Sequence, residues 1–275
     1  MQKSTDHSAA GTRATGAAFR LLGADEPPAF IVERRHGASN FVIVVDHASA
    51  RIPRRLGDLG LPAGELQRHI AWDIGALAVA RRVAAELDAP LVAQNYSRLV
   101  IDCNRDPKVE TSIPRKSEAV EIPGNAGLSD EEATARRLEI FEPYHAEVRA
   151  LLDARLAAHR PTILVAQHTM TDIYHGVRRA MHAAVLYNRD RRFAGLMLEM
   201  LRREPQLSIT DNEPYFVSDD TDYSIPQHGE ARGLPHVEIE IRQDLVADEG
   251  GQRQWAGRIG AALRAAEQAF FGAYR

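Results

Sequence analysis

The chain has 275 residues, 44% hydrophobic and 26% charged, which is the composition of a globular protein with a sizeable core. Its net charge of −4 gives no basic surface of the kind that predicts a nucleic-acid partner. One cysteine, Cys103, excludes a disulfide within the chain, and no apolar run approaches the roughly 20 residues that span a bilayer.

Residues 1–24 are polar and lack the apolar middle of a signal peptide, so we expect a flexible N-terminal arm. We expect residues 25–275 to form one domain, because no linker-like stretch interrupts them. The single cysteine is compatible with the reducing cytoplasm, where we expect the protein to be located.

Runs of β-branched and aromatic residues alternate with helical patterns along the chain. The runs predict strands at 30–32, 41–45, 90–93, 99–101, 162–166, 183–187 and 237–242. Helical spacing predicts helices at 65–71, 74–87, 129–159, 192–203 and 252–271, the third opened by an S-D-E-E capping box. Residues 108–128 and 204–235 read as long irregular connections. The alternation predicts an α/β fold, a three-layer α/β/α sandwich with a mixed, mostly parallel sheet.

Polar side chains follow two of the predicted strands. His47 comes after the run 41–45, and His168 comes after the run 162–166. Ligands of open α/β sheets lie beyond the carboxyl ends of strands, so two histidines and a carboxylate there would suit a three-ligand zinc site with an open position. The alternative is that each histidine is a hydrogen-bonded structural residue, and that Asp73 only caps the helix at 74–87.

Glu238 and Glu240 alternate with apolar residues, which places both carboxylates on one face of a predicted strand. Burying carboxylates is costly unless they are paired or near a metal, so one of them is a candidate base. The alternative is an edge strand with one face in water.

Arg98 and Arg105 bracket the predicted strand 99–101, and guanidinium groups suit bidentate capture of a carboxylate. Seven extended residues span roughly 23 Å, so we expect separate roles for the two arginines unless the chain turns after Tyr96–Ser97. The chain has no G-x-S-x-G, G-x-G-x-x-G or Walker pattern. A serine or cysteine hydrolase remains a third possibility, through Ser49 or Cys103.

The sequence resembles the N-formylglutamate amidohydrolase family. The matching stretches run in the family's order from the strand at 41–45 onward. They are DHASARIP (46–53), AWDIGA (71–76), YSRLVIDCNR (96–105), QHT (167–169), NEPY (212–215) and EIRQDL (240–245), of which the third and the last are the most specific.

The resemblance implies a phosphorylase/hydrolase-like fold, distantly related to zinc carboxypeptidases, and a hydrolase using Zn²⁺ or another divalent metal. Its substrate would be a small N-acyl amino acid such as N-formyl-L-glutamate. His47, Asp73 and His168 would hold the metal, with Asp46 as the alternative to Asp73. Glu240 would be the general base and Arg98 would stabilise the oxyanion. The residues similar to the relatives' substrate-binding segments are Asn104, Arg105 and Arg242.

The sequence departs from the H-x-x-E metal motif of the carboxypeptidases, because Ala50 stands three residues after His47. It also has DHAS where many members of the family have a PHSG-like segment. The missing ligand motivates an alternative function, a binding or regulatory protein that keeps the hydrolase fold without catalysis.

Overall fold

The computed structural model describes residues 19–272, which fold around one seven-stranded sheet with the strand order β1-β3-β2-β6-β11-β9-β10. Strands β3, β2, β6 and β11 run parallel to one another. Strand β1 pairs antiparallel with β3, β9 pairs antiparallel with β11, and β10 runs parallel to β9. The strands are Phe30–Glu33 (β1), Phe41–Val45 (β2), Leu91–Gln94 (β3), Ile163–Met170 (β6), Ala183–Leu186 (β9), Ile209–Asp211 (β10) and His236–Arg242 (β11). The predicted mixed, mostly parallel sheet is therefore confirmed.

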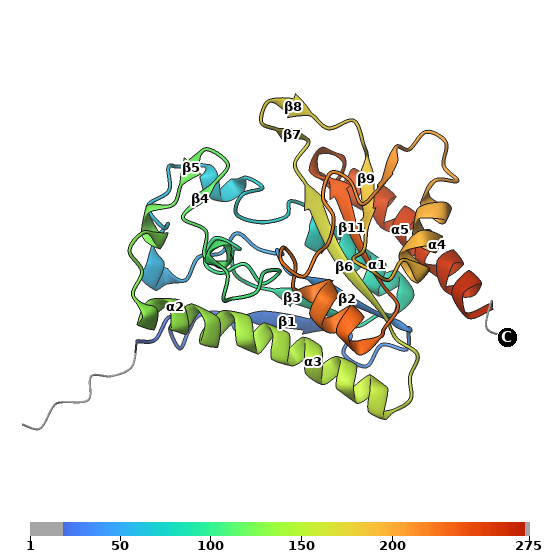
Figure 1. Ribbon diagram of the computed structural model, residues 1–275, viewed down its shortest axis with the longest axis horizontal. Helices are drawn as coiled ribbons and strands as arrows, with labels where there is room; N and C mark the ends of the chain where they lie inside the picture. Colours follow the sequence, from blue (N-terminus) through green and yellow to red (C-terminus); the bar gives the residue numbers. More distant parts are fainter. Residues whose placement is uncertain (1–18, 273–275) are drawn as a thin grey trace, which may run out of the picture.

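Helices cover both faces of the sheet, which makes the three predicted layers (Figure 1). One face packs against α1 (Ala76–Leu87), α4 (Arg192–Leu201) and α5 (Glu249–Gly272). The other packs against one long helical segment: α2 (Asp130–Arg136), a π-helical stretch and α3 (Glu142–Ala157). Ser129 opens this segment, accepting a hydrogen bond from the Glu132 backbone amide in the predicted capping box.

The sheet is buried at its centre because its strands carry apolar side chains on both faces. Every residue of β2, β6 and β11 is buried. Residues 41, 43 and 45 belong to the core under α1, α4 and α5, while residues 42 and 44 belong to the core under α2 and α3. This pattern is why a continuous apolar run, rather than an alternating one, marks a central strand.

The structure corrects several predicted elements. Residues 98–100 form a turn rather than part of a strand, and the predicted helix at 65–71 is a 3₁₀ turn at Glu65–Gln67. Strand β10 lies in the stretch predicted to be irregular. Two small hairpins were also not predicted: β4–β5 at Lys116–Ser117 and Val120–Glu121, and β7–β8 at Ile173–Tyr174 and Val177–Arg178. In Figure 1 the hairpin β7–β8 lies above the carboxyl end of β6.

Most of the predicted N-terminal arm lies outside the described residues. Its last part, residues 19–24, packs on the domain: Leu21 is 1% exposed, and Glu139 accepts hydrogen bonds from the backbone amides of Leu21 and Leu22. This part of the arm therefore belongs to the folded domain. Within residues 19–272, no helix has both the length and the apolar character needed to cross a membrane.

Candidate metal centre and active site

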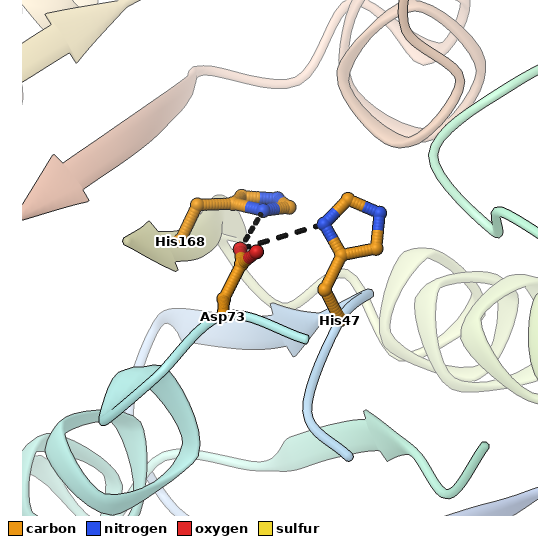
Figure 2. Close-up of side chains that lie close together, drawn as sticks. All are labelled: His47, Asp73 and His168. Carbon is orange, nitrogen blue, oxygen red and sulfur yellow. Dashed lines mark hydrogen bonds and ion pairs between the residues drawn. The ribbon is translucent and has the colours of Figure 1, made fainter. Parts of the chain in front are cut away.

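His47, Asp73 and His168 meet beyond the carboxyl ends of the central strands. His47 follows β2, His168 lies near the end of β6, and Asp73 precedes α1. The Asp73 carboxylate lies between the two rings (Figure 2): its Oδ2 is 2.8 Å from Nδ1 of His168 and 3.4 Å from Nδ1 of His47. One ligand atom from each residue lies within 4.8 Å of the others, so the three could hold a metal ion.

The main chain fixes the position of Asp73. Its backbone amide donates to the carbonyl of His47 at 2.9 Å, which ties the segment before α1 to the end of β2. Helix α1 starts after Gly75, which has φ +82° and lies so close to Val246 that a Cβ atom would be 2.5 Å from the Val246 carbonyl oxygen. Asp73 makes no side-chain cap to this helix. The alternative that Asp73 serves only as a helix cap is therefore wrong.

A second carboxylate faces the outer nitrogen of each imidazole. Nε2 of His47 lies 2.7 Å from Oδ1 of Asp102, and Nε2 of His168 lies 3.3 Å from Oδ2 of Asp46. Metal-bound histidines commonly have such a carboxylate partner, which fixes the ring and its tautomer. Asp46 thus contacts the outer nitrogen of a candidate ligand, whereas Asp73 lies between the inner nitrogens of both histidines. These positions favour Asp73 over Asp46 as the third ligand.

The donor set fits a divalent metal. If Nε2 of His47 donates to Asp102, then Nδ1 carries a lone pair, and this lone pair faces the Asp73 carboxylate without a hydrogen-bond partner. Two buried electron-rich atoms facing each other are unfavourable unless a proton or a cation lies between them. Two imidazoles and one carboxylate are also a ligand set that zinc uses in hydrolases.

The electrostatics of the cluster favour positive charge at its centre. Burial and Arg98 act to lower the pKa of His47, but Asp102 and Asp73 outweigh them and the pKa is raised. Burial likewise acts to lower the pKa of His168, while Glu238, Asp46 and Asp73 raise it well above its ordinary value. The surroundings that favour a protonated imidazole would also favour a bound cation.

Glu238 and Glu240 point into the same space from β11. Their neighbours 237, 239 and 241 pack in the core under α1, α4 and α5, so both carboxylates lie on the opposite face, as the alternation predicts. They are 3% and 9% exposed, so the wet edge strand considered as the alternative is wrong, since β11 is central. Burial raises the pKa of Glu240 to about 7, and its Oε2 has no hydrogen-bond partner.

The turn at 98–100 brings Arg98 and Arg105 to one carboxylate. Nη2 of Arg98 lies 2.6 Å from Oδ2 of Asp102, and Nε of Arg105 lies 3.6 Å from the same atom. Nη1 of Arg98 is also 3.8 Å from Asp73. The extended segment, on which the expectation of separate roles for the two arginines was based, is therefore wrong. The other possibility, a turn after Tyr96–Ser97, is the one observed.

Asn104 lines the cavity, but its side chain forms hydrogen bonds to another segment of the protein. Its Oδ1 accepts hydrogen bonds from the backbone amides of Tyr223 and Ser224, and its Nδ2 donates to Asp222. Asn104 thus links the turn after residue 101 to the segment 222–224.

Arg242 lies outside the residues that line the cavity. Its guanidinium donates to the carbonyls of Arg179 and Met181 and forms an ion pair with Asp244. These contacts fit a structural role, in which Arg242 fixes the segment 179–181 beside β11.

The two candidate nucleophiles are also placed away from the cavity lining. Cys103 is fully buried, and burial raises the pKa of its thiol well above the ordinary value. Ser49 accepts a hydrogen bond from the backbone amide of Arg51. Neither position favours covalent catalysis.

One cavity of about 700 Å³ joins these groups. The candidate ligands, both glutamates and both arginines line it, and so do residues of the hairpins β4–β5 and β7–β8. The hairpins were missed because four strand residues in a polar stretch carry little periodic signal. The contact between Asp102 and His47 was missed because it joins side chains 55 positions apart.

The sequence and the fold are similar to those of known proteins. A family model described as N-formylglutamate amidohydrolase matches residues 39–247. The crystal structure of gene product Atu2144 from Agrobacterium tumefaciens is 38% identical, with a TM-score of 0.88 over 91% of this chain and 99% of that one. N-formylglutamate amidohydrolase from Ralstonia eutropha JMP134 is 18% identical and shares the fold, with a TM-score of 0.66 over 90% of this chain and 100% of that one. Among curated proteins none matches. The extent of the family match shows that the chain belongs to the N-formylglutamate amidohydrolase family.

Proposed function

We propose that this protein is a metal-dependent amidohydrolase that cleaves the N-formyl, or another N-acyl, amide of an acidic amino acid such as N-formyl-L-glutamate. The observation that carries the proposal is that His47, Asp73 and His168 face the same cavity as the buried carboxyl group of Glu240. A ligand set beside a base with a pKa near neutrality is the arrangement that amide hydrolysis by water requires.

His47, Asp73 and His168 would hold Zn²⁺ or another divalent ion, whose chemistry would be to polarise the amide carbonyl and acidify a water molecule. Asp102 and Asp46 would keep the outer nitrogens of the two histidines protonated, so that the inner nitrogens face the ion. The resident metal is best identified by direct analysis, because the same ligand types also suit other transition metals.

Glu240 would act as the general base and then as the general acid. A carboxylate whose pKa is about 7 can accept a proton from water and return it to the leaving amine at neutral pH. The products would be the free carboxylic acid and the free amino acid, with the amide C–N bond replaced by a C–O bond and an N–H bond.

Arg98 would face the developing oxyanion, and Arg105 the α-carboxylate of the substrate. Arg98 is anchored by Asp102, which fixes its guanidinium beside the candidate ligands. Arg105 contacts Asp102 only at 3.6 Å, and its side chain is 30% exposed, so its guanidinium can bind an incoming carboxylate. Asn104 would contribute by fixing the loop that carries Arg105.

The alternative, a binding or regulatory protein without catalysis, rests on Ala50. Ala50 packs beside an apolar cluster that includes Leu59 and Leu99, so position 50 is used for packing. Asp73 supplies the carboxylate of the candidate metal-ligand group instead. Because the ligand group is complete without position 50, the enzyme is favoured over the non-catalytic binding protein.

The test uses purified protein and N-formyl-L-glutamate, with released glutamate as the readout. We expect near-stoichiometric metal in the protein as isolated or after loading with Zn²⁺, loss of turnover on chelation and recovery when the metal is returned. A protein that binds no divalent metal, or that keeps full activity with a chelator, would contradict the proposal. Metal binding with no turnover on any N-acyl amino acid would favour the binding protein.

A further inference from the structure

The cavity has an aromatic rim, which we define as Tyr174, Tyr215 and Phe216. All three line the cavity, and they are 42%, 39% and 66% exposed. Tyr174 lies in the hairpin β7–β8, and the other two lie in the loop after β10. Exposed aromatic side chains grouped at the mouth of a cavity with convergent polar groups are typical of a ligand-binding wall.

A buried arginine contacts the two tyrosines of the rim. Arg179 is 8% exposed, and its guanidinium carbon lies 5.2 Å from the ring centroid of Tyr174 and 4.7 Å from that of Tyr215. It donates hydrogen bonds to the Tyr215 hydroxyl and to the Thr171 carbonyl. Because one side chain contacts both tyrosines and the Thr171 carbonyl just after β6, the two tyrosines of the rim have fixed positions relative to β6.

The segment that fixes the rim and the turn that carries Arg105 lie beside different strands of the sheet. The turn that carries Arg105 follows β3. Asp102 in this turn forms a hydrogen bond with His47, which follows β2. The segment that carries Arg179 lies beside β11, because Arg242 donates to the carbonyl of Arg179. In the sheet, β3 and β11 stand on either side of the pair β2 and β6.

These positions assign the two ends of the substrate. An amide whose α-carboxylate binds Arg105 and whose carbonyl lies at the candidate ligands has its acyl group on the side away from Arg105. That side is the aromatic rim. A formyl group, with a single carbon, leaves the rim without contacts, whereas a larger apolar acyl group reaches it. A cavity of about 700 Å³ is also of the size that holds drug-sized ligands.

We propose that the preferred substrate is an N-acyl amino acid whose acyl group is large and apolar, such as an arylacetyl group, and that Tyr174 and Phe216 contact this group. The inference rests on the proposed amidohydrolase function and names its substrate class. Apolar contact that is made in the transition state raises kcat/KM, so the preference is measurable as a ratio between substrates that differ only in the acyl group.

The experiment compares N-formyl-, N-acetyl- and N-phenylacetyl-L-glutamate as substrates of the Zn²⁺-loaded protein. We expect kcat/KM for the phenylacetyl compound to exceed that for the formyl compound by at least tenfold. Phe216→Ala and Tyr174→Ala should each lower the value for N-phenylacetyl-L-glutamate about tenfold and change that for N-formyl-L-glutamate less than twofold. Val177→Ala is the matched control, because Val177 lies in the same hairpin, is 69% exposed and does not line the cavity.

Three results would overturn the inference. One is equal or better turnover of the formyl compound. Another is an equal effect of the rim variants on both substrates. The third is a gain from N-formyl-L-phenylalanine and none from N-phenylacetyl-L-glutamate, which would place the amino-acid side chain at the rim.

Calorimetry separates failure of this inference from failure of the proposed function. With Zn²⁺-loaded Glu240→Gln protein, N-phenylacetyl-L-glutamate should bind at least tenfold more tightly than N-formyl-L-glutamate, and Phe216→Ala in the same background should remove the difference. This binding preference without turnover in the native protein would support the rim assignment and reject the amidohydrolase. Turnover of the formyl compound without the preference would do the reverse.

Discussion

Nε2 of His47 lies 2.7 Å from Oδ1 of Asp102, and both residues are at least 97% buried. The same carboxylate binds Arg98 through its other oxygen. Asp102 therefore joins a candidate metal ligand to a candidate oxyanion donor. The family resemblance implies that the neighbouring residues Asn104 and Arg105 bind substrate, whereas Asp102 itself bonds two side chains of the protein.

Asp102→Asn should weaken metal binding about 10- to 100-fold, because the amide keeps the shape of the carboxylate but loses the charge that orients His47. Competition with a zinc chelator of known affinity measures the change. Asp106→Asn is the matched control, since Asp106 follows four residues later and bonds only the backbone amide of Lys108. Equal affinity of Asp102→Asn and native protein would show that the contact is only structural.

Asp73→Ala should abolish stoichiometric metal binding, whereas Asp46→Asn should only weaken it. The reason is that Asp73 faces both inner nitrogens, while Asp46 faces the outer nitrogen of His168 and also accepts from Tyr144. Metal content after dialysis, read by plasma mass spectrometry, tests the pair. If Asp46→Asn is the variant that loses the metal, the ligand assignment is wrong.

Glu240→Gln should lower kcat by about 10² to 10⁴ and leave the metal content near normal, since only the proton-accepting group is removed. Steady-state release of glutamate together with metal analysis provides both numbers. Glu238 lies two residues away on the same face and supplies the comparison. Should Glu238→Gln stop turnover while Glu240→Gln does not, the base is Glu238.

Arg105→Ala should raise KM for an acidic N-formyl amino acid by at least tenfold, which corresponds to about 1.4 kcal/mol of lost binding. Amidation of the substrate's α-carboxylate should reproduce this loss in the native enzyme and add little in the variant. Arg115→Ala is the control, because Arg115 also lines the cavity but is paired with Glu110 at its surface. Equal weakening of both proteins by amidation would exclude Arg105 as the carboxylate-binding residue.

A buried histidine pair should make the protein less stable in acid. Nε2 of His145 lies 2.8 Å from the Cys103 carbonyl, which can only accept, so Nδ1 of His145 accepts from Nε2 of His228 at 2.9 Å. This pattern of donors and acceptors holds when both rings are neutral, which is the state that their burial favours. Burial lowers the pKa of His145 to about 4 and that of His228 to about 3.

The unfolded chain has ordinary histidine pKa values near 6.5, so below that pH it binds more protons than the folded protein and stability falls. The loss is about 2 kcal/mol per histidine between pH 7 and pH 5. His228→Gln should reduce the loss by about this amount in urea unfolding with a chelator present, whereas the exposed His36→Gln should not. An unchanged loss in His228→Gln would contradict the neutral pair.

The central strands could be predicted because burial on both faces leaves an unbroken apolar run such as Phe41–Val45. The same signal failed at Leu99–Ile101, which is as apolar and as buried but lies in and just after a turn. Burial there comes from contacts with distant segments, for instance the packing of Leu99 beside Leu59 and Ile122. A sequence read locally does not distinguish the two cases.

The two histidine ligands were predicted from their places at strand ends and Asp73 from the family resemblance, and the structure brings the three together. The contacts around the ligands were not predicted, because they join residues that are far apart in the sequence. Examples are the contact of Asp46 with His168 and the hydrogen bonds of the Asn104 side chain with the backbone at 223–224. Arg242 shows the opposite error. It stands in a family motif, yet its guanidinium is bonded to main-chain carbonyls and Asp244.

Strand β11 stands between β6 and β9 although it is the last strand along the chain. During synthesis on the ribosome, β6 must therefore wait about 70 residues for its partner, with one edge of a buried apolar strand unpaired in the meantime. Glu240, the candidate base, arrives with that strand and therefore after the three candidate ligands. Over this interval a nascent chain presents an unpaired apolar strand edge, which is the kind of surface that makes a partly folded chain aggregate.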